Sequence, residues 1–210
     1  MHSFQLINYD IVINMKIVIA SNNIHKISEY RDLFSGTDIE VMSMDEVGIS
    51  VNPDETGATY EENATVKAEA IARLTNHIVI ADDSGLEIKA LNDLPGLNSA
   101  RFAAERGGSK SANQAILKMM HNVSDRSARF VCVIALSNFG EKTIVFRGEC
   151  HGTITNQEIG EQGFGYDPIF FSNEAHQPFA KLSKKEKNLY SHRSKAVSKL
   201  IQHFLNNKVR

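Results

Sequence analysis

Two adjacent carboxylates, Asp82 and Asp83, lie between the apolar run 77–81 and the dipeptide Ser84-Gly85. Two like charges this close are costly to bury unless a cation lies beside them. Mg²⁺ suits such a place, because it takes one or two carboxylates and completes its shell with waters and phosphate oxygens. In an extended segment the two side chains point to opposite sides, so one of them would enter a cleft. The alternative is an Asp-rich turn in which Gly85 takes a positive φ.

A polar segment, Ser-Asn-Asn-Ile-His-Lys at 21–26, follows a short apolar run and precedes a helical pattern. Backbone N–H groups at the start of a helix attract anions, and Lys26 adds a positive charge. The segment is therefore a candidate phosphate site. The alternative is a plain polar N-cap with a solvated lysine.

An acidic loop and a basic run are further candidates. Asp54 and Glu55 precede a capped helix, and an acidic loop by itself is usually only solvated. The basic run would normally form a solvated helix face, and it consists of Lys184, Lys185, Lys187, His192 and Arg193. Because a helix N-terminus disfavours cations, His192 and Arg193 at the start of the last helix suggest a ligand with negative charge nearby.

Together these segments could form a site for a nucleoside triphosphate. The cations that could neutralise phosphates are Lys26, Lys67, Lys187 and Arg193. Glu55 and Asp83 could hold the metal, and the loop 164–167 could hold a base by stacking and hydrogen bonding. The sequence contains neither the P-loop pattern GxxxxGK[ST] nor the zinc pattern HExxH, which argues against P-loop NTPases, kinases and zinc hydrolases.

The composition indicates an ordinary globular protein, with 42% apolar and 23% charged residues among 210. A net charge of −2 argues against polymeric nucleic acid as a partner, and no apolar stretch approaches the roughly 20 residues that cross a membrane. Cys132 and Cys150 lie in apolar runs without a CxxC pattern, so we expect buried, reduced thiols in a cytoplasmic protein. Residues 1–14 make a poor signal peptide and are interpreted as an N-terminal extension before a single domain at 15–210, whose natural start could be Met15.

Apolar runs predict the strands that must position the candidate residues. Short strands and one extended continuation are expected at 16–20, 39–42, 77–81 and 86–91. The segments 129–137 and 142–151 flank Phe139-Gly140 and predict an antiparallel hairpin. Strands and helices mixed in this way predict an α/β fold with a mixed β-sheet.

Helical spacing and capping boxes predict the helices. Thr59 with Glu62 forms a capping box, so a helix should run to about Leu74, with Asn63 and Lys67 on one flank. Other helices are expected after the polar segment 21–26, at 109–120 and from about residue 191, and Ser183 with Glu186 forms a second capping box. The residues expected to face the core in the helices at 59–74 and 109–120 are Ala64, Ala68, Ile71 and Leu74, and Ala112, Ala115, Ile116 and Met119.

Seven motifs in order make the chain resemble the inosine triphosphate pyrophosphatase family. They are Ser-Asn-Asn-x-x-Lys (21–26), Glu-Thr-Gly-x-Thr-Tyr-x-Glu-Asn-Ala (55–64), Ala-Asp-Asp-Ser-Gly-Leu (81–86), Leu-Pro-Gly (94–96), Ser-Ala-Arg (99–101), Gly-Phe-Gly-Tyr-Asp-Pro-Ile-Phe (163–170) and Lys-x-x-x-Ser-His-Arg (187–193). The resemblance covers about residues 16–204, and any one motif alone would be weak. It implies two lobes around a central nucleotide-binding cleft, and a homodimer.

The resemblance also implies an activity: hydrolysis of ITP, dITP and XTP to the monophosphate and pyrophosphate, which keeps deaminated purines out of DNA and RNA. It implies that Glu55 and Asp83 bind Mg²⁺ and that Asp83 is the general base for the attacking water. The implied substrate-binding residues are Ser21, Asn22, Asn23, Ile24, His25 and Lys26 for the triphosphate, Lys67, Ser84 and Lys187 for phosphate and sugar, and Phe164, Gly165, Tyr166, Asp167, His192 and Arg193 for the base. Arg101 lies near a position where the family has a basic residue.

Selection among purines should depend on the 6-position of the base. Donors set for a 6-oxo group are left unpaired, or facing other donors, when adenine enters, and such a mismatch reaches about 10⁴–10⁵ in discrimination. Guanine shares the 6-oxo group, so its exclusion must use the 2-position. Two other functions stay open: a related pyrophosphatase that prefers pyrimidine or modified nucleotides, and a nucleotide-binding module without catalysis, against which the acidic pair argues.

Overall fold

The computed structural model describes residues 15–53 and 55–207, so the predicted extension at 1–14 lies outside the described residues. Within them, eight strands form one sheet in the order β2-β1-β3-β5-β6-β7-β8, and β4 pairs with β3. The strands are β1 (Met15–Ile19), β2 (Ile39–Ser43), β3 (Ile78–Ile88), β4 (Leu94–Pro95), β5 (Ser127–Ser137), β6 (Ile144–Ile154), β7 (Phe170–Ser172) and β8 (Gln177–Pro178). The α-helices are α1 (Ile24–Phe34), α2 (Tyr60–Ala72), α3 (Ser99–Glu105), α4 (Ser109–Met119), α5 (Lys184–Lys187) and α6 (His192–Asn206).

The sheet is mixed, as predicted. β1 pairs in parallel with both β2 and β3, and the other pairings are antiparallel. The predicted hairpin is β5 with β6, whose register runs from Ser127 opposite Thr153 to Leu136 opposite Ile144. The α/β fold with a mixed sheet is therefore confirmed.

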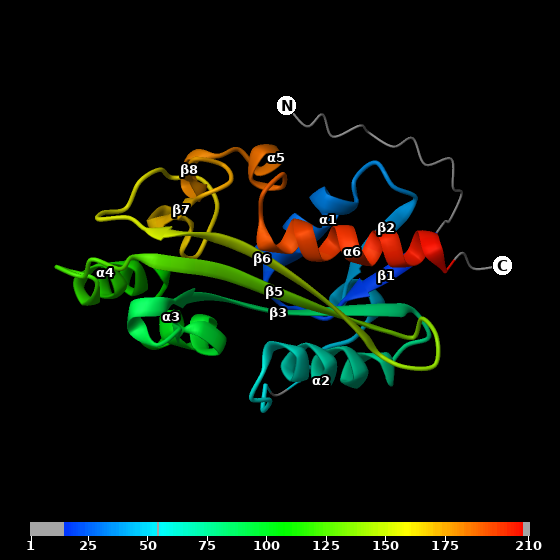
Figure 1. The fold of residues 1–210 in the computed structure, drawn as a ribbon. Helices are drawn as coiled ribbons and strands as arrows, with labels where there is room; N and C mark the ends of the chain where they lie inside the picture. Colours follow the sequence, from blue (N-terminus) through cyan, green and yellow to red (C-terminus); the bar gives the residue numbers. More distant parts are fainter. Residues whose placement is uncertain (1–14, 54, 208–210) are drawn as a thin grey trace.

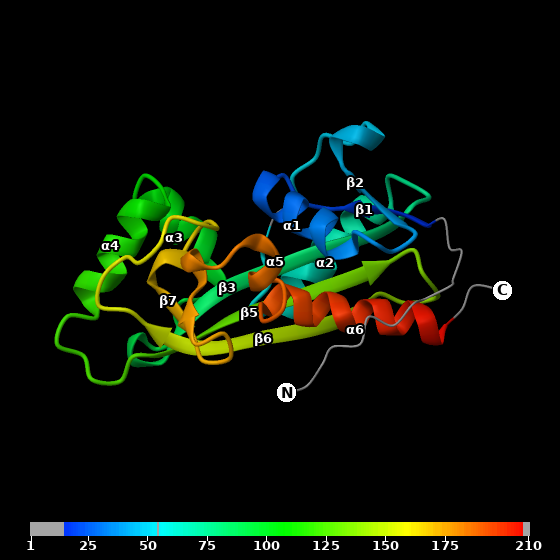
Figure 2. The ribbon, with the colours of Figure 1, turned by 90° about the horizontal axis from the view of Figure 1, so that it is seen from above.

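Helices cover both faces of the sheet. The elements also form two groups, one toward each end of the long strands. In Figure 1, α1 and α6 lie on one face and α2 lies on the other. Figure 2 shows α3, α4 and β7 toward one end, and β1, β2 and α1 toward the other. Separate buried clusters accompany these layers, with Phe34 and Leu200 under α1 and α6, Ala68 under α2, and Ile116 under α4. Because β3, β5 and β6 run through both halves, the two lobes share one sheet.

The centre of β3 has an unpaired edge between the two lobes. On that side β1 pairs only with residues 78–80, and β4 pairs only with Glu87 and Ile88. Side chains replace the missing strand, because Lys67 Nζ donates to the carbonyl oxygen of Asp82 at 2.8 Å and the Leu86 N–H donates to Ser99 Oγ at 3.0 Å. The gap in the sheet thus creates a place where polar side chains meet backbone.

The prediction that a strand ends before Asp82 is wrong. β3 continues to Ile88, because β5 pairs with it along its whole length from Val79 onward. The turn with a positive φ at Gly85 is excluded as well, since Gly85 lies inside the strand. Glycine is required there for space: a Cβ atom would lie 2.2 Å from the carbonyl oxygen of Gly96.

The two capping boxes differ. Thr59 Oγ1 accepts from the N–H of Glu62 at 3.1 Å, but the Glu62 carboxylate accepts from Ala58, so only half of the box forms. Ser183 and Glu186 form the complete box that the sequence predicts. Both serve to start a helix at the edge of the region between the lobes.

Two residues predicted to face the core lie at the surface. Leu74 is 54% exposed because α2 ends at Ala72, and Met119 is 40% exposed while its neighbour Met120 is buried instead. The two cysteines are free and buried, as predicted.

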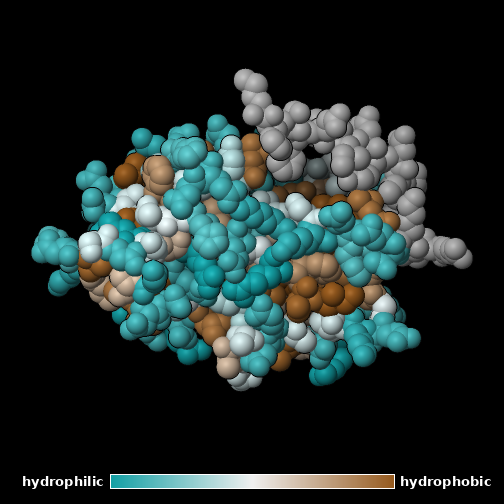
Figure 3. All heavy atoms as spheres, viewed as in Figure 1, coloured by the Kyte–Doolittle hydropathy of each residue, from teal (hydrophilic) through white to brown (hydrophobic). Residues whose placement is uncertain are grey.

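Figure 3 shows a largely hydrophilic face, on which apolar residues gather between α6 and α2. Across the part of the chain that the structure describes, no helix combines the length and the apolar composition that a membrane span requires.

Candidate active site

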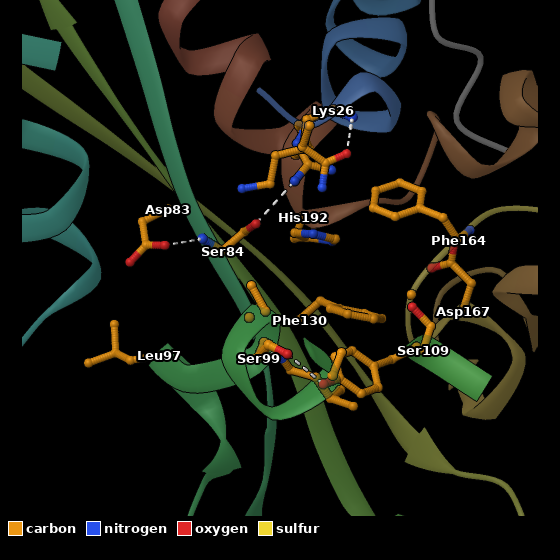
Figure 4. A pocket seen from close by; sticks show the side chains of 18 of the residues that line it. Lys26, Asp83, Ser84, Leu97, Ser99, Ser109, Phe130, Phe164, Asp167 and His192 are labelled. Atoms are coloured by element: carbon orange, nitrogen blue, oxygen red, sulfur yellow. Dashed lines mark hydrogen bonds between the residues drawn. The ribbon is translucent and has the colours of Figure 1, made fainter. Parts of the chain in front are cut away.

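A cavity of about 290 Å³ opens beside the unpaired edge of β3, between the two lobes (Figure 4). Its walls come from the start of α1, from β3, β5, α3, α5 and α6, and from the loop 163–167. Twelve predicted site residues line it, namely Asn23, Lys26, Glu55, Asp83, Ser84, Phe164, Gly165, Tyr166, Asp167, Lys187, His192 and Arg193. The fold thus brings five separate segments of the sequence into one cavity.

Six predicted site residues do not line this cavity: Ser21, Asn22, Ile24, His25, Lys67 and Arg101. Ile24 is 74% exposed and Arg101 is exposed on α3, so their side chains lie away from it. His25 lies close by, because its ring stacks on Phe164 at 5.0 Å between centroids. Lys67 lies behind two of the lining residues, as described below.

The segment 21–26 was interpreted either as a phosphate site or as a plain polar N-cap with a solvated lysine. The start of α1 shows features of both. Asn23 is the N-cap, and its side chain accepts from the N–H groups of His25 and Lys26 at 3.0 and 3.2 Å. Lys26 is not solvated, however, because its Nζ lies 2.8 Å from Asp82 Oδ1 and its side chain is 17% exposed. The helix start therefore presents a lysine that is already held by a buried carboxylate.

Asp82 and Asp83 point to opposite faces of β3, as the extended backbone predicts. Asp82 is 1% exposed and meets Arg193, whose Nε and Nη2 lie 3.0 and 2.9 Å from Asp82 Oδ2. Asp83 faces α2, where Asn63 Nδ2 donates to its Oδ2 at 3.1 Å and Lys67 Nζ lies 3.6 Å from its Oδ1. The four-residue spacing of Asn63 and Lys67 on α2 places both beside the same carboxylate.

Lys67 joins the two predicted metal ligands. Its Nζ lies 2.8 Å from Glu55 Oε1 as well as 3.6 Å from Asp83 Oδ1. Burial raises the pKa of Asp83 above its ordinary value, although the charge of Lys67 acts in the opposite direction. One buried ammonium group thus holds together two carboxylates that border the cavity.

These carboxylates fit a hard divalent cation. Glu55 and Asp83 offer two carboxylate ligands on one side of the cavity. Mg²⁺ commonly takes one or two carboxylates from a protein, while substrate phosphates and waters complete its shell. In residues 15–53 and 55–207, no group of three or more His, Cys, Asp or Glu side chains is arranged to enclose a metal. The protein would therefore hold the ion together with its substrate.

A buried network of ion pairs crosses the cavity wall from α1 to α6. Its pairs are Lys26–Asp82, Arg193–Asp82, Arg193–Glu29, Lys187–Glu29 and Lys187–Asp167. Burial by itself would raise the pKa of Glu29, but the charges of Arg193 and Lys187 outweigh burial and lower it. The predicted solvated face is therefore wrong for Lys187 and Arg193, which are 5% and 2% exposed, and it holds for the exposed Lys184 and Lys185.

The opposite end of the cavity is aromatic. His192 stacks on Phe130 with 4.7 Å between ring centroids and an angle of 12°, and Phe164 lies across the cavity from this pair (Figure 4). Lys187 Nζ lies 4.9 Å from the centre of the Phe164 ring. His192 Nδ1 is buried and has no hydrogen-bond partner in the described residues. Flat rings with polar groups at their edges are suited to a heterocyclic base.

His192 is neutral in the folded protein. Burial lowers its pKa well below the ordinary value, and the charges of Arg193 and Lys187 lower it further. The unfolded chain takes up a proton near pH 6.5 and the folded chain does not, so stability is lost as the pH falls below about 6.5. We expect His192 to account for about 1.4 kcal/mol of lost unfolding free energy at pH 5.5 relative to pH 7.5.

Urea unfolding of His192→Phe at both pH values measures this contribution, because phenylalanine keeps the ring but cannot titrate. The variant should lose less stability on acidification than the wild type. The control is His121→Phe at an exposed position, which should leave the loss unchanged. An equal loss in His192→Phe and in the wild type would show that His192 does not titrate between the two states in this range.

Several residues of the site could not be identified from the sequence motifs alone. Glu29 lies on α1 three residues after Lys26, so helical spacing could have indicated that the two share a face. Asn63 was placed beside Lys67 but without a function. Ser99 lies in the motif 99–101 but was given no function, and no local pattern distinguishes Phe130 on β5 from an ordinary core residue.

Known proteins resemble this chain along most of its length. The model of the Ham1 family matches residues 17–203. A dITP/XTP pyrophosphatase of Staphylococcus aureus is 45% identical over 190 residues, which cover 90% of this chain and 96% of the relative. A dITP/XTP pyrophosphatase of Clostridium perfringens is 42% identical and covers 88% of this chain and 95% of its own length. The solved structure of the Staphylococcus aureus Ham1 protein superposes with a TM-score of 0.81 at 44% identity, covering 92% of this chain and 100% of that chain.

Proposed function

The chain belongs to the Ham1 family. We propose that it hydrolyses dITP and XTP, which the names of its relatives give, and also ITP, in each case to the monophosphate and pyrophosphate. The observation that carries the proposal is a single cavity with an acidic pair, Glu55 and Asp83, on one side and an aromatic end with the buried His192 on the other. A nucleoside triphosphate needs both. By this activity the protein would keep deaminated purines out of DNA and RNA.

We assign the chemistry to Asp83. Its carboxylate borders the cavity, is held by Asn63, and can take the proton of a water that attacks the α-phosphorus. Glu55 and Asp83 would hold Mg²⁺, which when bound supplies positive charge to the phosphate oxygens and the pyrophosphate leaving group. Lys67 would orient the two carboxylates, because it contacts both.

The triphosphate is assigned to the wall formed by Asn23, Lys26 and Ser84. These residues line the cavity near β3, and Ser84 Oγ accepts from Arg193 Nη2 at 3.1 Å. Lys26 brings positive charge, part of which is already balanced by Asp82. Neutralisation of a triphosphate at this wall would therefore depend on the metal as well as on lysine.

The base is assigned to the aromatic end. Phe164 and the stacked pair of His192 and Phe130 offer flat surfaces, and Lys187 and Arg193 offer hydrogen-bond donors suited to a 6-oxo group. Adenine presents a 6-amino donor to the same place and would leave those donors unpaired. This arrangement favours the deaminated purines over ATP.

Pyrophosphate release from ITP tests the proposal. With Mg²⁺ the protein should release pyrophosphate and IMP, and with a chelator it should release neither. ITP, XTP and dITP should be cleaved with much higher kcat/KM than GTP or ATP. Absence of pyrophosphate with all of them would leave a nucleotide-binding module, whereas preference for UTP or dTTP would favour the related pyrimidine-directed pyrophosphatases.

Two further proposals concern the oligomeric state, which the family resemblance implies, and the location, which the cysteines suggest. We propose that the protein works as a homodimer, which light scattering of the purified protein would test. We also propose a cytoplasmic location, which the two buried free thiols favour because reducing compartments keep cysteines unpaired.

A further inference from the structure

Asn113 lies on α4, behind the loop 163–167 and outside the lining of the substrate cavity. It is 2% exposed, and its Nδ2 donates to the carbonyl oxygen of Gly165 at 3.1 Å. Its Oδ1 is also buried but has no hydrogen-bond partner among the described residues. Burying an amide whose oxygen has no partner costs free energy, and an apolar side chain at this position would avoid that cost. The presence of asparagine therefore suggests that its bond to Gly165 has a role beyond core packing.

The loop that receives this bond has an unusual backbone. Gly163 and Gly165 both have positive φ angles, 75° and 64°. The two ends of the loop are tied together, because the N–H of Phe164 donates to Asp167 Oδ2 at 2.9 Å and the N–H of Asp167 donates to the carbonyl oxygen of Phe164 at 3.2 Å. The middle is open, since nothing lies within 4 Å of a Cβ position at Gly165.

The same loop separates two cavities. A second cavity of about 270 Å³ lies on its far side and is lined by Asn113 and Gly163. Phe164 and Gly165 line both this cavity and the substrate cavity. Phe164 and Tyr166 are packed on either side of Gly165, but no described residue lies against the Cβ side of Gly165 itself, so the orientation of the peptide that follows it depends on hydrogen bonds.

The bond from Asn113 fixes one peptide plane of this wall. In a trans peptide the carbonyl group and the N–H of the following residue point in opposite directions. Asn113 lines the second cavity and not the first, so it draws the Gly165 carbonyl to that side. The N–H of Tyr166 then points away from Asn113, and Tyr166 lines the substrate cavity. The Tyr166 hydroxyl donates to the carbonyl oxygen of Ser99 at 2.7 Å.

We infer that Asn113 is a positioning residue for base selection, which holds the Gly165–Tyr166 peptide so that a backbone N–H faces the purine. The inference rests on the proposed function, because it concerns the base end of the proposed site. Without the Asn113 donor, the Gly165 carbonyl loses its buried partner and the peptide can rotate. The base then loses one fixed donor, whereas Asp83 and Glu55 at the other end of the cavity are untouched.

Asn113→Leu and Asn113→Ala test the inference, because both remove the donor and both residues favour helices. We expect the KM for ITP to rise about tenfold, which is the size of one lost hydrogen bond, while kcat stays within about twofold. The ratio of kcat/KM for ITP to that for ATP should fall by a similar factor, because the lost donor serves only the 6-oxo base. Steady-state pyrophosphate release measures all three quantities.

The control is Gln114→Leu, which makes the same kind of change at the exposed neighbour on α4 and should alter nothing. Thermal melting shows which variants are folded, and either Asn113 variant alone suffices for the test. An unchanged KM and an unchanged ITP-to-ATP ratio in a folded variant would overturn the inference. So would an equal fall of kcat for both nucleotides, which indicates a structural role only. Wild-type protein that releases no pyrophosphate from ITP would instead contradict the proposed function itself.

Discussion

Asn in place of Asp83 should lower kcat for ITP by about 10²–10⁴-fold, the contribution typical of a positioned general base, while the protein still folds. Asparagine has the shape of aspartate but cannot accept a proton from water. The side chain is 7% exposed and lies between Asn63 and Lys67, so a residue of the same shape can be accommodated. The measurement is the rate of pyrophosphate release at saturating ITP and Mg²⁺.

Two comparisons give the result its meaning. Asp125→Asn makes the same change at an exposed aspartate and should leave kcat unaltered. Raising Mg²⁺ until the rate no longer increases separates weaker metal binding from loss of the base, because only the first is restored. A turnover close to that of the wild type would remove Asp83 from the mechanism.

The long hairpin and the caps could be predicted from sequence because their signals are local. Apolar runs around Phe139-Gly140 define β5 and β6, and Ser183 with Glu186 defines the start of α5. The continuity of β3 could not be predicted, since Asp82 to Gly85 have the composition of a turn. Pairing with β5, about 50 residues later in the sequence, overrides that local preference. No pattern within β3 predicts this long-range pairing.

Twelve of the eighteen predicted site residues line one cavity, but the electrostatics of that cavity could not be predicted. The cations predicted to neutralise phosphates were Lys26, Lys67, Lys187 and Arg193, and all of them except Lys67 line one cavity. Lys26, Lys187 and Arg193 pair with Asp82 and Glu29 because of the way α1, β3 and α6 pack together. This packing cannot be predicted from any single short segment of the sequence. Because carboxylates largely balance these cations, a triphosphate in the cavity would need further positive charge, which the proposed Mg²⁺ would supply.

Arg193→Met should destabilise the protein by about 3–5 kcal/mol, the usual cost of removing one partner from a buried ion pair. Arg193 is 2% exposed, contacts Asp82 through Nε and Nη2, and also pairs with Glu29. Methionine fills much of the space but leaves each carboxylate with a single lysine. Urea unfolding gives the change directly, and Arg73→Met, at a side chain that is 78% exposed, should change stability by no more than about 0.5 kcal/mol. Equal stability of the two variants would contradict the expected cost.

A double variant shows where that cost comes from. If it arises from the carboxylate left unpaired, then Glu29→Gln should be less damaging in the Arg193→Met background than in the wild type, with a coupling of about 0.5–3 kcal/mol. Strictly additive costs would show that Glu29 and Arg193 act independently, despite their contact. Coupling is expected because α1 and α6 meet through this pair, with Lys187 on α5 as the other partner of Glu29. Buried ion pairs add little net stability themselves. The role of the Glu29–Arg193 pair, together with Lys187, would then be to fix the positions of α1, α6 and α5 around the cavity.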